Sequence, residues 1–198
     1  MDYSLIFNHF LIWIEFNYIF ALLLFFFFIL FYSTFSLPGL VVFFVYGGYS
    51  FGIFWSYIIC LIGVTFGSLF FFIISKYVLS KFFKKLYKKY TDKVEHFIKD
   101  STLEYLIIFR IFPGTPLMIQ NILLSLLDIS IFKFIFSTLI GLSPIILFCV
   151  FIGNKINSVI ILNNFSFNNI FSWDLFFISF ILIVIITIRI LFKKKRLN

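Results

Sequence analysis

The longest uncharged stretch of the chain is the feature that most limits how it can fold. Residues 16–75 contain no Asp, Glu, Lys, Arg or His. A helix needs about 20 apolar residues to cross the hydrocarbon core of a bilayer, so this stretch is long enough for more than one crossing. Over the whole chain 63% of the residues are hydrophobic and 12% are charged. Soluble domains have roughly half and a quarter, so the sequence predicts an integral membrane protein.

Most of the lysines and arginines lie in two blocks, within residues 76–100 and 189–196. Basic segments beside membrane spans are held on the cytoplasmic side and are attracted to anionic headgroups. We therefore interpret residues 76–100 as a basic amphipathic linker on the cytoplasmic surface. The net charge of +8 does not indicate nucleic-acid binding, because no base-reading or stacking surface accompanies it.

Residues 17–75 form the first predicted half, after an interfacial segment at residues 1–16. A first span is expected at residues 17–35. Pro38, Gly47 and Gly48 then interrupt an apolar run, as expected of the turns of a re-entrant hairpin over residues 37–50.

A second span is expected at about residues 51–75. Within it Gly63 and Gly67 have the spacing of a helix–helix contact face.

The second predicted half covers residues 101–153 and is also interrupted. Pro113, Gly114 and Pro116 rule out one straight helix, so we predict a helix, a turn and a helix as a second re-entrant hairpin. A third span follows at about residues 131–152, with Gly141 and Pro144 at an expected kink.

Residues 154–198 are expected to supply an external loop, a last transmembrane helix at about residues 173–191 and a basic tail. With both basic blocks inside, the two hairpins enter from opposite faces. The predicted fold is all-α, with about four transmembrane helices and an inverted repeat, which is typical of transporters with a site near the midplane.

Arg110 is the strongest candidate for a functional residue. An arginine at bilayer depth costs about 3 kcal/mol on insertion scales and persists mainly where it faces a partner or a cavity. Its planar group can hold a phosphate or a carboxylate. The structural alternative is an ion pair with Glu104 or Asp128, and both interpretations stay open.

Other polar residues within the apolar segments have more than one interpretation. Asn121 and Gln120 are costly in lipid and are expected to line a cavity with Arg110. Glu15 is either a proton carrier or an interfacial carboxylate. The sequence contains no catalytic motif and no metal-ligand spacing, so we expect neither an enzyme nor a cofactor.

Several motifs together resemble one family. They are Phe109-Arg110-Ile111-Phe112-Pro113-Gly114-Thr115-Pro116 with Asn121, then Gly141-Leu142-Ser143-Pro144 and Gly153, and upstream Leu37-Pro38, Gly47-Gly48, Phe51-Gly52, Gly63 and Gly67. This order over about residues 37–153 resembles the VTT-domain superfamily of DedA and SNARE-associated Golgi proteins. The likeness is closer to the Golgi vesicle-protein branch than to DedA proper.

The resemblance implies paired re-entrant hairpins and movement of phospholipid or polyprenyl-phosphate headgroups. It places the family arginine on Arg110 and the polar helix residue on Asn121. DedA proper has a second arginine where this chain has Pro116 and a glycine where it has Ser125. DedA proper also has an acid before the first hairpin proline, where this chain has Tyr32 and Ser33, so passive scrambling and proton-coupled transport both stay open.

The leading hypothesis is a lipid transporter or scramblase in the cell membrane, the inner membrane if the source is bacterial. A transporter of small anions is one alternative. Another is a membrane scaffold that binds anionic lipid through residues 76–100. Membrane lipids are the expected partners, and a homo-oligomer stays open.

Overall fold

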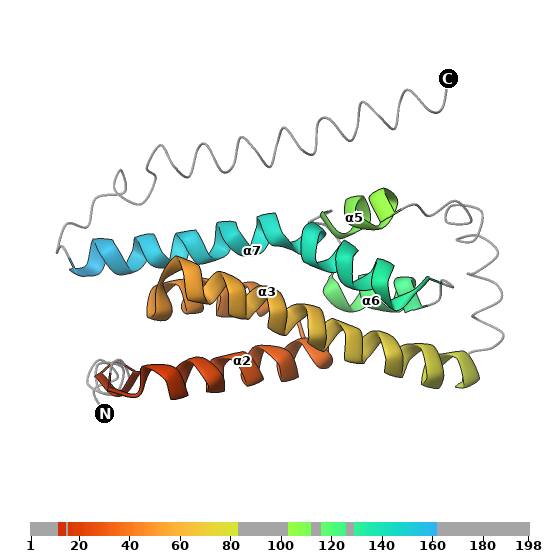
Figure 1. Ribbon diagram of the computed structural model, residues 1–198, viewed down its shortest axis with the longest axis horizontal. Coiled ribbons are helices and arrows are strands. Elements are labelled where there is room, and N and C mark those ends of the chain that lie inside the picture. Colours follow the sequence, from red (N-terminus) through yellow and green to blue (C-terminus); the bar gives the residue numbers. More distant parts are fainter. Residues whose placement is uncertain (1–11, 15, 83–102, 112–115, 126–128, 162–198) are drawn as a thin grey trace, which may run out of the picture.

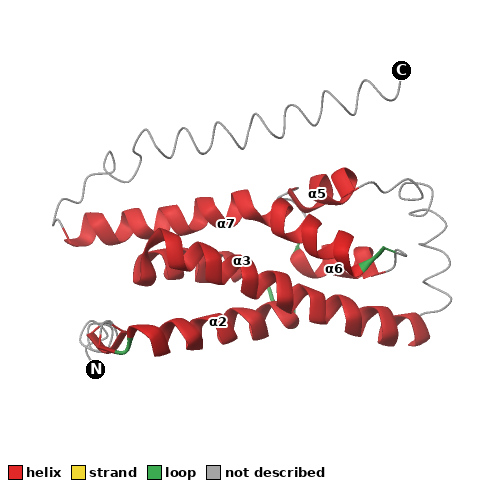
Figure 2. Cartoon of the chain, in the orientation of Figure 1, coloured by secondary structure: helices red, strands yellow, loops and turns green. Residues whose placement is uncertain are grey.

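The described part of the chain consists of helices and short turns. The computed structural model describes residues 12–14, 16–82, 103–111, 116–125 and 129–161. Its elements are α2 (Tyr18–Thr34), α3 (Leu40–Phe82), α5 (Leu103–Ile111), α6 (Leu117–Ser125) and α7 (Ile131–Ile161), arranged as in Figures 1 and 2. The prediction of an all-helical protein is confirmed for these residues.

Helix α3 is two helices that meet at Gly52. This glycine has φ 74° and ψ 177°, a backbone conformation that other residues rarely adopt. The Ser56 hydroxyl donates a hydrogen bond to the carbonyl of Gly47, nine residues earlier. A straight helix would hold these two residues roughly 13.5 Å apart along its axis. The chain therefore reverses at Gly52, from a first arm (residues 40–51) into a long arm (residues 53–82), as Figure 1 shows.

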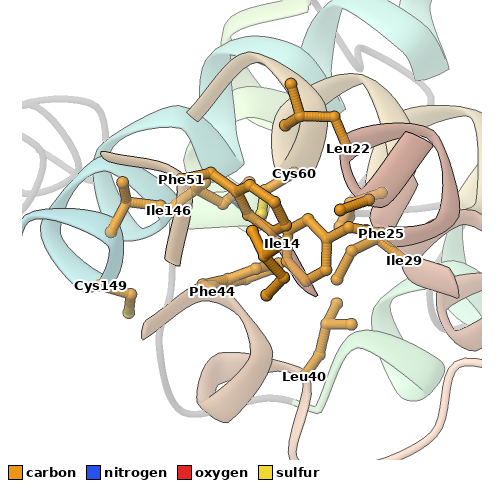
Figure 3. Packing of buried hydrophobic residues seen from close by; sticks show 13 residues of the cluster. Ile14, Leu22, Phe25, Ile29, Leu40, Phe44, Phe51, Cys60, Ile146 and Cys149 are labelled. Carbon is orange, nitrogen blue, oxygen red and sulfur yellow. The ribbon is translucent and has the colours of Figure 1, made fainter. Parts of the chain in front are cut away.

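Helix α2 and the first arm of α3 form a helical hairpin. This corrects the hairpin predicted within residues 37–50, because residues 40–51 form a single helical arm and α2, predicted as a separate first span, is the other arm. Aromatic pairs join them along their length: Tyr32 with Phe43 (ring centroids 4.8 Å apart), Phe25 with Tyr46 (6.2 Å) and Tyr18 with Phe51 (6.0 Å). The pairs run in opposite directions along the two helices, so the arms are antiparallel. Figure 3 shows the buried apolar side chains around Phe25, Phe44 and Phe51.

The turn of this first hairpin lies between α2 and α3. Ser36 has φ 49° and Gly39 has φ 90°, and Pro38 lies between them, in a turn as predicted. Gly47 and Gly48 were also predicted at turns, and this is wrong, because both lie within the helix of the first arm. Their lack of a side chain serves close approach instead: a Cβ on Gly48 would lie 2.0 Å from the carbonyl oxygen of Val150 in α7.

Helices α5 and α6 form the second interrupted segment. The described part of each has nine residues, or roughly 13.5 Å, which is less than half of a hydrocarbon core of about 30 Å. Helix α6 begins directly after Pro116, whose carbonyl accepts a hydrogen bond from the Gln120 amide at 3.1 Å. The predicted helix break is confirmed. Pro113 and Gly114 lie outside the described residues.

The long arm of α3 and α7 are antiparallel neighbours. Tyr57 and Ser143 are joined by a hydrogen bond of 2.5 Å, and further along the rings of Phe72 and Phe134 lie 4.3 Å apart. The first hairpin contacts the later part of α7, where a Cβ on Gly153 would meet the α3 backbone. Helix α5 contacts the earlier part of α7, at Gly141.

The first hairpin and the segment of α5 and α6 therefore lie toward opposite ends of the bundle, as Figure 1 shows. They meet between α6 and the turn of the first hairpin. There the Asn121 side-chain amide donates a hydrogen bond of 3.1 Å to the Ser36 hydroxyl.

Two described helices, over Leu40–Val78 and Ile131–Ser158, are long and apolar enough to cross a membrane. Helix α7 continues to Ile161, so the loop predicted from residue 154 is wrong for residues 154–161. The contact between Gly153 and α3 accounts for the difference, since tertiary contacts override the weak helix preference of the asparagines there. The last predicted span, the basic tail and residues 83–102 lie outside the described residues.

Small residues bring α2 and the long arm of α3 together. A Cβ on Gly63 would lie 3.0 Å from Ile29, and one on Gly67 would lie 1.9 Å from the Ser33 hydroxyl. The predicted helix–helix contact face is confirmed.

Candidate functional site

Arg110 is buried at the end of α5. Only 2% of its surface is exposed, and it is the largest side chain of the described residues that is almost fully buried. Its stem lies against Gly141, where a Cβ would stand 2.3 Å from the Arg110 Cβ. Gly141 thus leaves room for the arginine between α5 and α7.

The guanidinium of Arg110 lies over an aromatic ring. Its central carbon is 4.8 Å from the centroid of Phe134, whose other contacts include the ring of Phe72. The Nε, Nη1 and Nη2 atoms make no hydrogen bond with any residue that the structure describes. A cation–π contact contributes about 2 kcal/mol when desolvated, whereas an uncompensated buried charge costs about 3–5 kcal/mol. The ring alone does not offset the burial.

The ion pair proposed as the structural alternative does not form with Glu104. That carboxylate is on the exposed face of α5 while Arg110 is buried, and no ion pair joins them in the part of the chain that the structure describes. Asp128 and Glu15, the other two candidate carboxylates, lie outside the described residues. The interpretation of Arg110 as a binding residue stays a prediction.

Asn121 and Gln120 are both buried on α6, with 0% and 2% of their surfaces exposed, and their role in lining a cavity stays a prediction. The Asn121 amide nitrogen donates to Ser36, and its Oδ1 has no hydrogen-bond partner among the described residues. Ser36 is itself buried, with a left-handed backbone that is uncommon outside glycine.

One apolar cluster connects Arg110 with Asn121. Its members come from the long arm of α3, from α5, from α6 and from the chain at the start of α7: Phe72, Leu106, Leu124, Ile129 and Phe134. Arg110 is one helical turn beyond Leu106, and Asn121 is one turn before Leu124. In sequence, each polar residue thus lies between its leucine and the interruption that separates α5 from α6.

Sequence reasoning missed two hydroxyl groups in this region. Ser68 and Ser75 lie one turn on either side of Phe72, and each has a buried hydroxyl without a partner among the described residues. Helical serines usually donate to a carbonyl one turn earlier, as Ser137 does to Phe134 at 2.9 Å. The spacing of Ser68, Phe72 and Ser75 on one helical face was the available signal.

Four of the predicted turn residues lie in the described part of the chain, whereas Pro113 and Gly114 lie outside it. Pro38 is exposed in the turn of the first hairpin, and Gly47 and Gly48 lie within the first arm of α3. Pro116 is exposed at the start of α6.

Long apolar helices that enclose a buried arginine and a buried asparagine on short helices define an integral membrane protein with a polar site in its interior. The family model of the VTT domain matches residues 37–155, more than half of the chain. The chain belongs to the VTT domain family, whose members are generally non-enzymatic membrane proteins. Its assignment to the Golgi vesicle-protein branch stays a prediction.

The chain is also similar to a curated protein, the Transmembrane protein 41 homolog of Dictyostelium discoideum. The two are 29% identical over 133 residues, which is 65% of this chain and 40% of that relative. The chain thus spans less than half of the relative's length. No solved structure matches the chain.

Proposed function

We propose that this protein moves phosphate-bearing lipid headgroups, of phospholipids or polyprenyl phosphates, across a bilayer. The observation that carries the proposal is the buried Arg110 guanidinium, whose nitrogens have no partner among the described residues. A guanidinium presents five N–H donors in a planar fork that fits two oxygens of a phosphate. A bound phosphate supplies the charge compensation that the Phe134 ring does not.

The arrangement of the hairpins supports a transport path. Short helices that end inside a membrane protein are typical of transporters, in which they place polar groups near the midplane. Here α5 ends next to Arg110, and α6 contacts the turn of the opposite hairpin through Asn121 and Ser36. A headgroup held between the two hairpins has polar contacts from both halves of the protein.

The apolar exterior supports a lipid as cargo. Large hydrophobic side chains are exposed along α2, both arms of α3 and α7, including Phe31, Val42, Phe70 and Phe132. Acyl chains can stay in contact with such a surface while a headgroup moves inside. The family membership agrees with this cargo, and we place the protein in the cell membrane with lipids as its partners.

The test is a dithionite assay in proteoliposomes that contain acyl-chain-labelled fluorescent phospholipid. The intact protein is expected to expose inner-leaflet probe to dithionite faster than protein-free liposomes lose it. Arg110→Ala should remove most of this acceleration. Lys155→Ala is the matched control, because it removes a cation that lies 5.5 Å from the ring of Phe151 elsewhere on α7.

Each alternative has its own result. No acceleration over empty liposomes rejects scrambling of the lipid tested, and full activity of Arg110→Ala rejects the assigned role. Uptake of phosphate or sulfate that depends on Arg110, without lipid movement, identifies a small-anion transporter. A scaffold predicts that neutralising the lysines of residues 76–100 abolishes function while Arg110→Ala has no effect.

A further inference from the structure

We infer that Asn121 selects the headgroup, and that its side-chain oxygen favours phospholipids whose headgroup carries an N–H or O–H donor beside the phosphate. This inference rests on the proposed function and narrows its substrate class. It follows from the direction of the hydrogen bonds at the contact between the two hairpins.

The orientation of the Asn121 amide is fixed by Ser36. The Ser36 hydroxyl has one proton, which it donates to the carbonyl of Ser33 at 3.2 Å. Toward Asn121 the same oxygen can only accept, so the amide nitrogen must face it, at 3.1 Å. The side-chain oxygen of Asn121 is then the end of the amide that Ser36 does not contact. It is buried and without a partner among the described residues.

A buried carbonyl oxygen without a donor is costly, and a donor that reaches it recovers that cost. Asn121 lies one turn from Leu124, and Arg110 lies one turn from Leu106. Leu106, Leu124 and the Phe134 ring beneath the guanidinium belong to one cluster. The cation and the oxygen therefore both lie next to members of the same apolar cluster. A ligand whose phosphate is held by Arg110 meets an acceptor at Asn121.

This pairing separates the headgroups by their chemistry. An ethanolamine carries an ammonium and a glycerol carries hydroxyls, so each can donate to Asn121. A choline carries a quaternary nitrogen with no N–H, and a polyprenyl monophosphate ends at its phosphate. Sites that contain a buried hydrogen-bonding group reject analogues that lack the matching group.

The experiment compares acyl-chain-labelled phosphatidylethanolamine, phosphatidylglycerol and phosphatidylcholine in proteoliposomes of one background composition. Labelling the acyl chain leaves the headgroup donors intact. The first two lipids are expected to move about three- to tenfold faster than phosphatidylcholine, the range for one net hydrogen bond. Asn121→Leu should bring the ratio close to one, whereas Asn157→Ala, a matched amide deletion on α7, should keep it. Ser36→Ala is a second variant, which removes the acceptor that orients the amide and should also lower the ratio.

The outcomes distinguish this inference from the proposed function. Equal rates for the three lipids in the intact protein overturn the inference and leave lipid transport standing. A preference that persists in both Asn121→Leu and Ser36→Ala overturns the role of Asn121. Movement of none of the three lipids overturns the proposed function for phospholipids and the inference with it.

Discussion

Gly141 of α7 lies so close to Arg110 of α5 that a Cβ on the glycine would stand 2.3 Å from the Cβ of the arginine and 3.0 Å from the carbonyl oxygen of Ile107. The first half of the protein contains a similar contact. There a Cβ on Gly67 would lie 1.9 Å from the Ser33 hydroxyl and 2.4 Å from the carbonyl oxygen of Leu30. In each half, a glycine of a long helix lies against a residue near the end of an earlier helix. The same glycine also lies against the carbonyl group of the residue three positions before that one. The two halves thus share one pattern of close contact, with Ser33 in the place that Arg110 has in the second half.

Gly141→Ala should displace α5 and with it the guanidinium. The added methyl meets backbone and stem atoms that cannot rotate away, and such overfilling costs about 1–3 kcal/mol. Lipid movement should fall more than stability, because the guanidinium must hold its position to bind. Unfolding can be followed in detergent through thiol labelling, since Cys60 and Cys149 are both buried and become reactive on unfolding.

The control for this variant is Ile140→Ala, at an exposed position of the same helix. Surface substitutions of this kind change stability by about 0.5 kcal/mol or less. If Gly141→Ala matched this control in both stability and transport, the close contact between Gly141 and Arg110 would not matter for function.

Gly67→Ala should destabilise the contact between α2 and the long arm of α3, and Ser33→Ala should partly rescue it. The added methyl first meets the Ser33 hydroxyl, which the second substitution removes, but the Leu30 carbonyl remains. We expect a coupling of about 0.5–1 kcal/mol in a double-mutant cycle measured by thermal unfolding. Strictly additive effects would show that the two residues do not share this space.

Tyr57→Phe should destabilise the protein by about 1 kcal/mol, because it removes the hydrogen bond between the long arm of α3 and Ser143 of α7. Ser143→Ala should have a similar effect, and the double variant should cost little more than either one. The unfolding midpoints of the three variants measure this directly. The interpretation would be contradicted by a double variant whose loss equals the sum of the single losses.

The sequence was sufficient to find Arg110 because one charge stands out in an apolar segment. It also located the helix break before α6, since Pro113 and Pro116 cannot continue a helix. It predicted a turn at Gly47 and Gly48 wrongly because glycines look like helix breakers, whereas here they allow close contacts, of Gly47 with Phe25 of α2 and of Gly48 with Val150 of α7.

Other features of the site depend on contacts between distant parts of the chain. Asn121 and Ser36 are 85 residues apart in sequence, so no local pattern indicates their hydrogen bond. Ser68, Ser75 and Phe134 are residue types that occur throughout membrane helices. Only the neighbouring helices reveal that the two hydroxyls are buried without partners and that this ring lies beneath a guanidinium.

The hairpin geometry makes a prediction about the two sides of the membrane. The Tyr18 hydroxyl donates to the carbonyl of Phe51 at 3.3 Å, so the start of α2 and the end of the first arm of α3 lie at the same level. Single cysteines at Phe16 and Phe54, both exposed, should therefore react with a membrane-impermeant maleimide from the same side. A cysteine at Tyr77, near the other end of the long arm, should react from the opposite side, because about 24 residues of helix separate it from Ile53 and span roughly 36 Å.

The two native cysteines are buried, and replacing both with alanine gives the background for this labelling. On the same background, single cysteines can be placed at each position of residues 37–52 and 110–121. None of them should react only from the side opposite to the one from which its hairpin enters the membrane. Labelling of Phe16 and Phe54 from opposite sides would mean that only one of α2 and the first arm of α3 crosses the bilayer, so that the two do not form a hairpin. The two hairpins could not then meet at Ser36 and Asn121 within the membrane, and the headgroup site would be lost.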